Sequence, residues 1–413
     1  MNQELLQRYA RLIVRTGANV QPGQRVELCA QVDQEALAAM IAQECYAAGA
    51  QYVELLWQSA AMDRLHYLHA DTDTLGEVRP WQEERARQRT EDLPVRIFLE
   101  SEDPDALNGI DPGKLTEVTQ RRQRVLKKYR EALDGKHQWC IAAAASPAWA
   151  TKVFPGVPEE EAVERLWQAI VDCVYLDTGR DPAEVWAEHN ANLSRRADWL
   201  NRMAFTSLEY HSANGTDFTV GLISGAKWAG AGDTNHTNDT FYVPNLPTEE
   251  VFTSPMRGVC QGTLVSVKPL SWSGQLIEDF SITYEDGKAV SCKARVGQES
   301  LEQLLHMDEG AAMLGEVALV PKESPINTSG LLFYSTLFDE NACCHVAAGH
   351  GFPEVLDDFL SLSKEELTER GVNDSMLHVD YMVGADDLSI TGVQADGTRV
   401  PIFVDGTWAD NVG

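Results

Sequence analysis

Residues 25–57 read RVELCAQVDQEALAAMIAQECYAAGAQYVELLW, and two patterns follow one another in this stretch. The runs at 25–29 and 52–57 are short, largely apolar and typical of strands. Residues 34–48 lie between them, have the composition of a helix and end at Gly49, a residue that commonly terminates helices. This stretch therefore predicts two strands joined by a helix, the unit from which parallel sheets are built.

The same alternation continues through the first 200 residues. Further strands are predicted at 95–99 and 138–144. Further helices are predicted at residues 2–16, 112–133, 159–176 and 182–203. Strands that alternate with helices predict a largely parallel sheet with helical cover.

After about residue 203 the pattern changes to short β-type runs separated by glycine and aspartate turns. Hairpin turns are predicted at 284–288 and 395–398, and a short helix at 298–307. Ser363 and Glu366 form a capping box that predicts a helix over 363–370. We therefore expect an α/β N-terminal domain over residues 1–203, followed by a β-rich α+β domain over residues 204–413.

The net charge is strongly negative, with 63 aspartates and glutamates against 34 lysines and arginines, for a formal charge of −29. Nucleic acids and anionic membranes would repel such a chain. No run reaches the ~18 apolar residues that a membrane helix needs. We expect neither nucleic acid nor a membrane as a partner. The charge indicates either solubility or carboxylates that bind cations.

Eight cysteines are spread through the chain without a C-x-x-C pair, which favours reduced thiols over a disulfide framework. The first residues have neither the basic nor the apolar segment of a signal peptide. Both observations predict a cytoplasmic protein. The chain also has no G-x-G-x-x-G that opens a helix, no P-loop, no G-x-S-x-G and no H-E-x-x-H.

Carboxylates and histidines lie inside apolar sequence in four segments of the second half, where a charge is unfavourable unless it is paired or metal-bound. These segments are residues 245–252, 315–321, 337–347 and 376–383. In the last of them, His378 and Asp380 are two apart in a predicted strand, so both project from one face. This arrangement fits half of a metal site, and it also fits a buried hydrogen-bonded His–Asp pair.

The other acids are more ambiguous when each is taken alone. Glu250 also fits a helix-capping arrangement, and Glu316 also fits a strand end at the surface. Glu340 and His345 are five apart, so a turn that enters a helix could bring them together, but a straight helix could not.

Two histidines and four acids in apolar surroundings are typical of a hydrolase with two cations roughly 3.5–4 Å apart, bridged by a carboxylate and a water. Imidazole ligands favour zinc, cobalt, iron or manganese over magnesium or calcium.

Five segments resemble, in order, the signature of the aminopeptidase T / aminopeptidase S family of metal-dependent exopeptidases. They are residues 245–255, 268–274, 315–321, 329–345 and 375–384. The resemblance implies an N-terminal α/β domain, a C-terminal β-rich catalytic region and a homodimer. It also implies cleavage of the first peptide bond of short peptides with a free N-terminus.

The resemblance further implies two divalent ions per chain, which we expect to be zinc, cobalt, manganese or magnesium, with Glu316 as the bridging ligand. The implied metal ligands are Glu250, Glu316, Glu340, His345, His378 and Asp380. Three neighbours are expected to assist them. Glu249 would bind the substrate's α-amine or act as general base, and Asp339 and Asn341 would orient the ligands beside them.

One position departs from the family pattern. Residues 345–353 read HVAAGHGFP, so Phe352 stands where the family usually has a tyrosine whose hydroxyl is thought to support the tetrahedral intermediate. His350 is expected either to substitute for that hydroxyl or to face solvent. Two alternatives to an aminopeptidase follow: another two-metal amide hydrolase, or a metal-loaded protein with reduced or lost activity.

Overall fold

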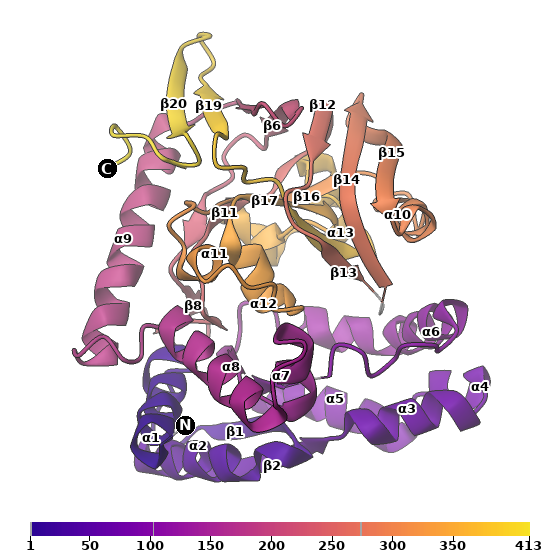
Figure 1. Cartoon of the computed structure of the whole chain (residues 1–413), viewed down its shortest axis with the longest axis vertical. Coiled ribbons are helices and arrows are strands. Elements are labelled where there is room, and N and C mark those ends of the chain that lie inside the picture. The colour runs from indigo at the N-terminus through magenta and orange to yellow at the C-terminus, as the bar shows by residue number, and fades with distance from the viewer. Residues whose placement is uncertain (1, 102, 273–274) are drawn as a thin grey trace. The chain divides into compact units, whose positions relative to one another are not determined.

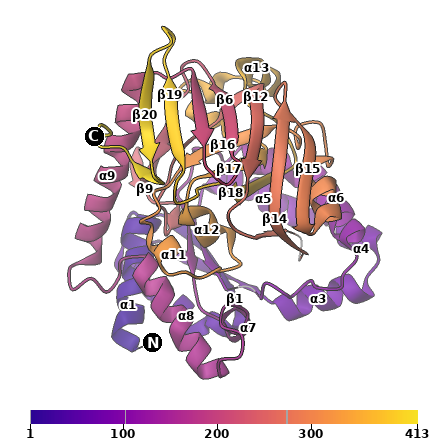
Figure 2. The same ribbon diagram turned by 45° about the horizontal axis from the view of Figure 1, so that its top comes forward.

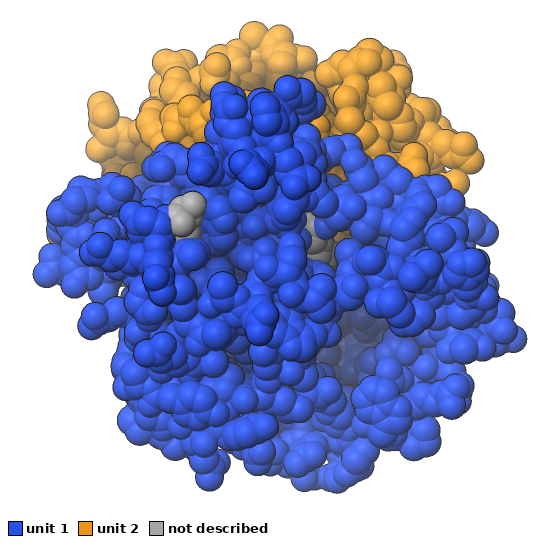
Figure 3. All heavy atoms as spheres, turned by 60° about the horizontal axis from the view of Figure 1, so that its bottom comes forward, with its two compact units in different colours: residues 1–187, 232–247 blue, residues 188–231, 248–413 orange. Residues whose placement is uncertain are grey.

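The computed structural model describes residues 2–101, 103–272 and 275–413, and these form two compact units. Unit 1 comprises residues 1–187 and 232–247, and unit 2 comprises residues 188–231 and 248–413 (Figure 3). The division after residue 203 stays a prediction; it falls at the end of α9 (Pro182–Met203).

A parallel sheet forms the centre of unit 1, with the strand order β10-β4-β3-β1-β2 among the described residues. The strands are β1 (Arg25–Gln31), β2 (Tyr52–Gln58), β3 (Val95–Glu100), β4 (Trp139–Ala143) and β10 (Asn245–Leu246). The four predicted strands are confirmed, and β1, in the interior of the sheet, is buried after its first residue. A two-stranded ribbon, β8 (Asp233–Asn235) with β9 (Thr240–Tyr242), completes the β-structure of this unit.

Helices flank this sheet in the chain order that the alternation predicts (Figure 1). They are α1 (Gln3–Leu12), α2 (Glu35–Ala47), α3 (Ala60–His69), α4 (Thr72–Gly76), α5 (Pro80–Asp92), α6 (Pro112–Glu131), α7 (Pro147–Val153) and α8 (Glu159–Cys173). A π-helical turn, Ile13–Gly17, continues α1, and a 3-10 turn, Val32–Gln34, precedes α2. No residue of α3 is buried, and its large apolar side chains Met62, Leu65 and Leu68 remain exposed.

Unit 2 contains a large antiparallel sheet in the order β13-β14-β12-β6-β5-β19-β20-β21, with β15 paired to β14 (Figure 2). Its strands are β5 (Ser207–His211), β6 (Asp217–Leu222), β12 (Pro255–Val265), β13 (Leu270–Trp272), β14 (Gln275–Glu285), β15 (Lys288–Val296), β19 (Ser389–Val393), β20 (Arg399–Val404) and β21 (Thr407–Trp408). The two predicted hairpins are confirmed as the β14–β15 and β19–β20 connections.

A second sheet in unit 2 has the order β18-β17-β16-β11-β7 and is antiparallel between the paired strands. Its strands are β7 (Ala229–Gly230), β11 (Val251–Thr253), β16 (Leu314–Leu319), β17 (His345–Gly349) and β18 (His378–Met382). Every residue of β16 and β17 is buried, so polar side chains on these strands point into the interior.

Short helices connect the strands of unit 2. They are α10 (Gln298–Leu305), α11 (Pro325–Thr328), α12 (Thr336–Asp339) and α13 (Lys364–Arg370), with 3-10 turns at Glu340–Ala342, Pro353–Val355 and Phe359–Ser361. The predicted capping box of α13 is confirmed, because Ser363 Oγ accepts from the Glu366 amide and the Glu366 carboxylate accepts from the Ser363 amide. None of the eight cysteines forms a disulfide. In the described chain, no helix combines the length and the apolar character needed to span a membrane.

Candidate metal centre

Strand register brings the predicted site residues of the second sheet to one face. Ala347 of β17 pairs with Glu316 of β16 on one side and with Asp380 of β18 on the other. Residues directly opposite one another share a face, as do residues two apart along a strand. His345 and His378 therefore join this face. The small Ala347 side chain leaves the space between Glu316 and Asp380 open to their carboxylates.

Tight backbone packing fixes the register at the end of β17. Gly349 pairs with His378 and has a φ of 105°, in the left-handed region. A Cβ atom at this position would lie 2.1 Å from the Leu377 carbonyl oxygen, so only glycine fits. The conformation of Gly349 thus helps to hold His378 at its place in the sheet.

Two groups of potential metal ligands share one carboxylate. The side-chain ligand atoms of Glu250, Glu316 and His345 lie within 4.8 Å of one another, and so do those of Glu316, His378 and Asp380. His345 Nε2 lies 3.2 Å from Glu250 Oε2, and His378 Nε2 lies 3.3 Å from Glu316 Oε2 and 3.4 Å from Asp380 Oδ1. Glu316 belongs to both groups, which is the geometry that a bridging ligand requires.

Glu340 lies in the 3-10 turn that follows α12, and its carboxylate is buried against the same group of acids. Burial raises the pKa of Glu340 well above its usual value, and the charges of Asp380, Glu250 and Glu316 raise it further. The sequence predicts a turn that enters a helix between Glu340 and His345. In the structure a helical turn instead leads into a strand, because His345 is the first residue of β17.

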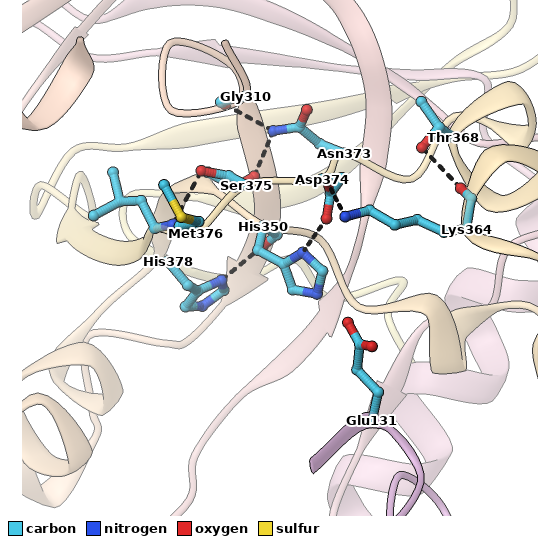
Figure 4. Close-up of polar contacts among 12 residues, drawn as sticks. Glu131, Gly310, His350, Lys364, Thr368, Asn373, Asp374, Ser375, Met376 and His378 are labelled. Carbon is cyan, nitrogen blue, oxygen red and sulfur yellow. Dashed lines mark hydrogen bonds and ion pairs between the residues drawn. The ribbon is translucent and has the colours of Figure 1, made fainter. Parts of the chain in front are cut away.

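The two histidines are oriented in the same way. His378 Nδ1 contacts the His350 carbonyl oxygen at 2.8 Å, and His345 Nδ1 contacts the Cys343 carbonyl oxygen at 3.3 Å (Figure 4 shows the first pair). A ring whose Nδ1–H donates to a carbonyl presents a lone pair at Nε2. Both Nε2 atoms point toward the carboxylates, so a cation among these groups could bind the imidazoles and the carboxylates together.

The pKa shifts of the buried side chains indicate that this cluster favours bound positive charge. Burial raises the pKa of Glu316 to about 7, although the hydrogen bond with His378 opposes the shift. Burial would lower the pKa of His345, but the hydrogen bond and charge of Glu250 outweigh it and raise that pKa to about 9. Burial would raise the pKa of Asp380, but the charge of His378 outweighs this effect and lowers the pKa to about 2. Without cations, the buried acids can be accommodated only by taking up protons or by pairing with protonated histidines.

The residues present fit divalent metal ions. Asp380 Oδ1 is buried and accepts no hydrogen bond from the described part of the chain, although His378 Nε2 lies 3.4 Å away, so this oxygen can still bind a cation. Four carboxylates and two imidazoles are borderline donors that suit zinc, cobalt or manganese, and the oxygen-rich set also admits magnesium.

Phe352 lies at the edge of this cluster. Its ring packs against the His378 imidazole at 4.9 Å between centroids and against Phe252 at 5.3 Å. Ser254 holds the backbone at this position, because its Oγ accepts from the Phe352 amide at 2.7 Å and donates to the Phe352 carbonyl at 3.2 Å. Sequence reasoning did not single out Ser254, and its position in the segment 245–255 was the available signal.

His350 is close to the site through its backbone, which accepts from His378, while its ring turns toward Asp374 (Figure 4). His350 Nδ1 lies 3.8 Å from Asp374 Oδ1, and Lys364 Nζ lies 2.7 Å from Asp374 Oδ2. The His350 side chain is 39% exposed. It is therefore partly accessible to solvent and electrostatically coupled to a carboxylate.

Three polar residues beside the ligands, Glu249, Asn341 and Asp339, make different contacts. Glu249 is buried, its carboxylate lies 3.7 Å from His189 Nε2, and its amide donates to Asn341 Oδ1 at 2.7 Å. Asn341 approaches Glu340 Oε1 only at 3.5 Å, and its shorter hydrogen bonds, to the Glu249 amide and the Leu337 carbonyl, hold the backbone. Asp339 accepts from the backbone amides of residues 333 and 335, and thus organises the loop before α12.

Comparison with known proteins gives consistent results along the whole chain. A sequence profile described as thermophilic metalloprotease (M29) matches residues 2–408. Aminopeptidase 2 of Geobacillus stearothermophilus is 40% identical over 405 residues, which cover 98% of this chain and 97% of the relative. Aminopeptidase AmpS of Bacillus subtilis is also 40% identical over 405 residues, 98% of each chain.

A solved structure, wild-type AmpT from Thermus thermophilus, superposes with a TM-score of 0.90 at 35% sequence identity and covers 98% of this chain and 99% of that one. The order of an α/β region and an antiparallel, sheet-rich region is therefore shared, and the predicted fold class is confirmed.

Proposed function

The chain belongs to the M29 family of thermophilic metalloproteases and is a hydrolase of the metallo-aminopeptidase type, and from this premise we propose that it releases N-terminal residues from short peptides by means of two divalent cations. The observation that carries the two-cation proposal is Glu316, whose carboxylate belongs to both ligand groups. The proposed ligands are those named from the sequence: Glu250, Glu316, Glu340, His345, His378 and Asp380.

The bound cations would polarise the scissile carbonyl and lower the pKa of a water molecule between them. The protein's part is to hold these ligands in one geometry. Glu316 bridges the two groups, and the Nδ1 contacts of His345 and His378 fix their rings. Glu249, buried beside Glu250, is the proposed acid for holding the substrate's α-ammonium or for accepting a proton.

An aminopeptidase must recognise a free α-amine, and this property separates the proposal from an amidase or deacetylase with the same ligands. We expect aminoacyl-arylamides with a free amine to be cleaved at least about tenfold faster than their N-acetylated counterparts, because acetylation removes a charged partner of the buried acids. Initial rates on matched pairs of substrates measure the ratio. Thiol alkylation should have a weak effect, since the mechanism has no cysteine nucleophile. Equal rates on blocked substrates would assign the chain to another class of amide hydrolase.

Phe352 favours one further candidate, a metal-loaded protein of this fold with reduced or lost activity. Turnover of free-amine substrates by the metal-loaded protein, compared with the metal-free protein, decides between the two. A cytoplasmic location is also part of the proposal, and the absence of disulfides among the eight cysteines supports it.

We also propose a homodimer, supported by an exposed apolar surface in unit 1 that we call the β2–α3 surface. β2 is an edge strand of the parallel sheet, and unpaired edges with apolar side chains favour association. Its large exposed side chains are Leu55 and Trp57, which share one face of β2, and Met62, Leu65 and Leu68 of α3, each at least 37% exposed. A patch of this kind on a monomeric protein is uncommon.

The double variant Leu55→Glu/Leu65→Glu should shift the protein from the mass of two chains to that of one, because two charges per copy would lose hydration in the interface. Light scattering coupled to size exclusion measures this mass. Val290→Glu/Leu360→Glu is the matched control, since both residues are similarly exposed in unit 2. An unchanged mass in the first variant would place the interface elsewhere or exclude the dimer.

A further inference from the structure

A pocket of about 330 Å³ in unit 1 is lined by four arginines, in a chain whose net charge is −29. Arg8 and Arg11 belong to α1, Arg15 to the π-helical turn that continues it, and Arg180 to the segment between α8 and α9. The only acidic residue in the lining is Asp181. The pocket therefore combines an excess of positive charge with a volume that suits a small molecule.

Helix geometry explains why three of these arginines converge. Positions 8, 11 and 15 are three and four residues apart, so they lie along one helical face. The helix widens at its end, where the amide of Ala18 donates to the Ile13 carbonyl at 2.7 Å over five residues. Such π-turns are rare and are found frequently at functional sites. The turn carries Arg15 to the same side as Arg11.

Arg8 brings the fourth arginine to the pocket. One of its terminal nitrogens, Nη2, donates to the Leu176 carbonyl at 2.8 Å and lies 3.4 Å from the Arg180 carbonyl. The other, Nη1, is 3.8 Å from the exposed carboxylate of Asp177. These contacts attach the segment 176–180 to α1 and thus hold Arg180 beside the helix. Arg8 therefore has a structural role, and it is also one of the residues that line the pocket.

Arg11 and Arg15 have no comparable role. Within the described chain, neither makes a hydrogen bond or an ion pair, although 63 acidic residues are available for pairing. Arginines near the end of a helix stabilise its dipole, and this effect accounts for a charge in the last turn of α1. It does not account for Arg180, which lies on another segment, or for the presence of all four arginines in the lining of one pocket.

We propose that this pocket binds a small molecule bearing phosphate groups. Planar guanidinium groups match phosphate oxygens with paired hydrogen bonds, and several of them together favour an anion of more than one charge. The surrounding acidic protein repels anions in general, so a ligand that contacts several of these arginines at once is favoured over other anions. The pocket lies within unit 1 and contains none of the proposed metal ligands. The proposal is therefore independent of the aminopeptidase assignment.

Titration calorimetry with inorganic pyrophosphate tests this proposal on the full chain. We expect saturable binding of one pyrophosphate per chain, weakened at least about tenfold in Arg11→Gln/Arg15→Gln and weakened by raised salt. Arg124→Gln/Arg202→Gln is the matched control. Both of its arginines are exposed and form no ion pair within the described chain, and the charge change is the same. Its affinity should equal that of the wild type.

Pyrophosphate also coordinates metals, so Glu316→Gln is a second control. Binding that persists in Glu316→Gln and is lost in Arg11→Gln/Arg15→Gln supports the arginine pocket. Binding that follows the opposite pattern belongs to the metal centre and overturns the proposal, as does an absence of binding at about 50 mM salt. If the double variant does not fold, Arg180→Gln provides the same comparison with a residue outside the helix.

Discussion

Glu316→Gln should lose both metal ions, or nearly so, and lower kcat/KM by more than about 10³-fold, because one carboxylate serves both ligand groups. An amide of the same size retains one oxygen but no charge. The two cations would then repel one another with less compensation between them. Elemental analysis of the purified protein should show up to two transition-metal ions per chain in the wild type and almost none in the variant.

Three control measurements test whether Glu316 serves both metal ions. Glu4→Gln alters an exposed acid at the start of α1 and should leave the metal content unchanged. A chelator should abolish cleavage by the wild type and lower its melting temperature, since ligands that bind only the folded state stabilise it. In Glu316→Gln the melting temperature should respond little to the chelator. Full metal occupancy in Glu316→Gln would refute the bridging assignment.

Phe352→Tyr should raise kcat about tenfold or more, with little change in metal content. A hydroxyl directed at the developing oxyanion stabilises the transition state more than the ground state. One such donor is typically worth about 10²–10³ in turnover, and the lower end of that range or less is expected here because two cations would already stabilise that oxygen. The Phe352 ring packs directly against His378, so a new hydroxyl would lie at the cluster.

His350→Ala is the companion measurement. If His350 supplies the missing donor, its removal should slow the native enzyme about tenfold, and Phe352→Tyr should partly restore the rate in the double variant. Steady-state kcat together with metal analysis separates a lost donor from a lost ion. An unchanged kcat in both Phe352→Tyr and His350→Ala would mean that neither position supports the intermediate.

Much of the fold could be predicted because it depends on local patterns. The strand-helix-strand stretch at 25–57 forms β1, α2 and β2 with boundaries that differ by a few residues. No helix was predicted where packing leaves little sequence pattern, as in α5, of whose side chains only Ala86 is buried. The helix predicted at 2–16 changes to a π-turn at Ile13, and no spacing rule in the sequence signals that change.

The candidate site was predictable in its parts but not in its assembly. The alternation of His378 and Asp380 placed both on one face, and β18 confirms it. The pairing of Ala347 with both Glu316 and Asp380 could not be foreseen, since it depends on the register of three strands that are far apart in sequence. Their roles as metal ligands, and that of Phe352, stay predictions.

The register of β17 also determines where the sequence can change length. Because side chains alternate along a strand, deleting one residue between His345 and Gly349 would turn His345 away from Glu316 or replace Ala347 by a neighbour on the opposite face. Insertions of one residue would have the same result. Lineages and engineered libraries should therefore accept insertions and deletions in the loops before and after this strand, and reject them within its five residues.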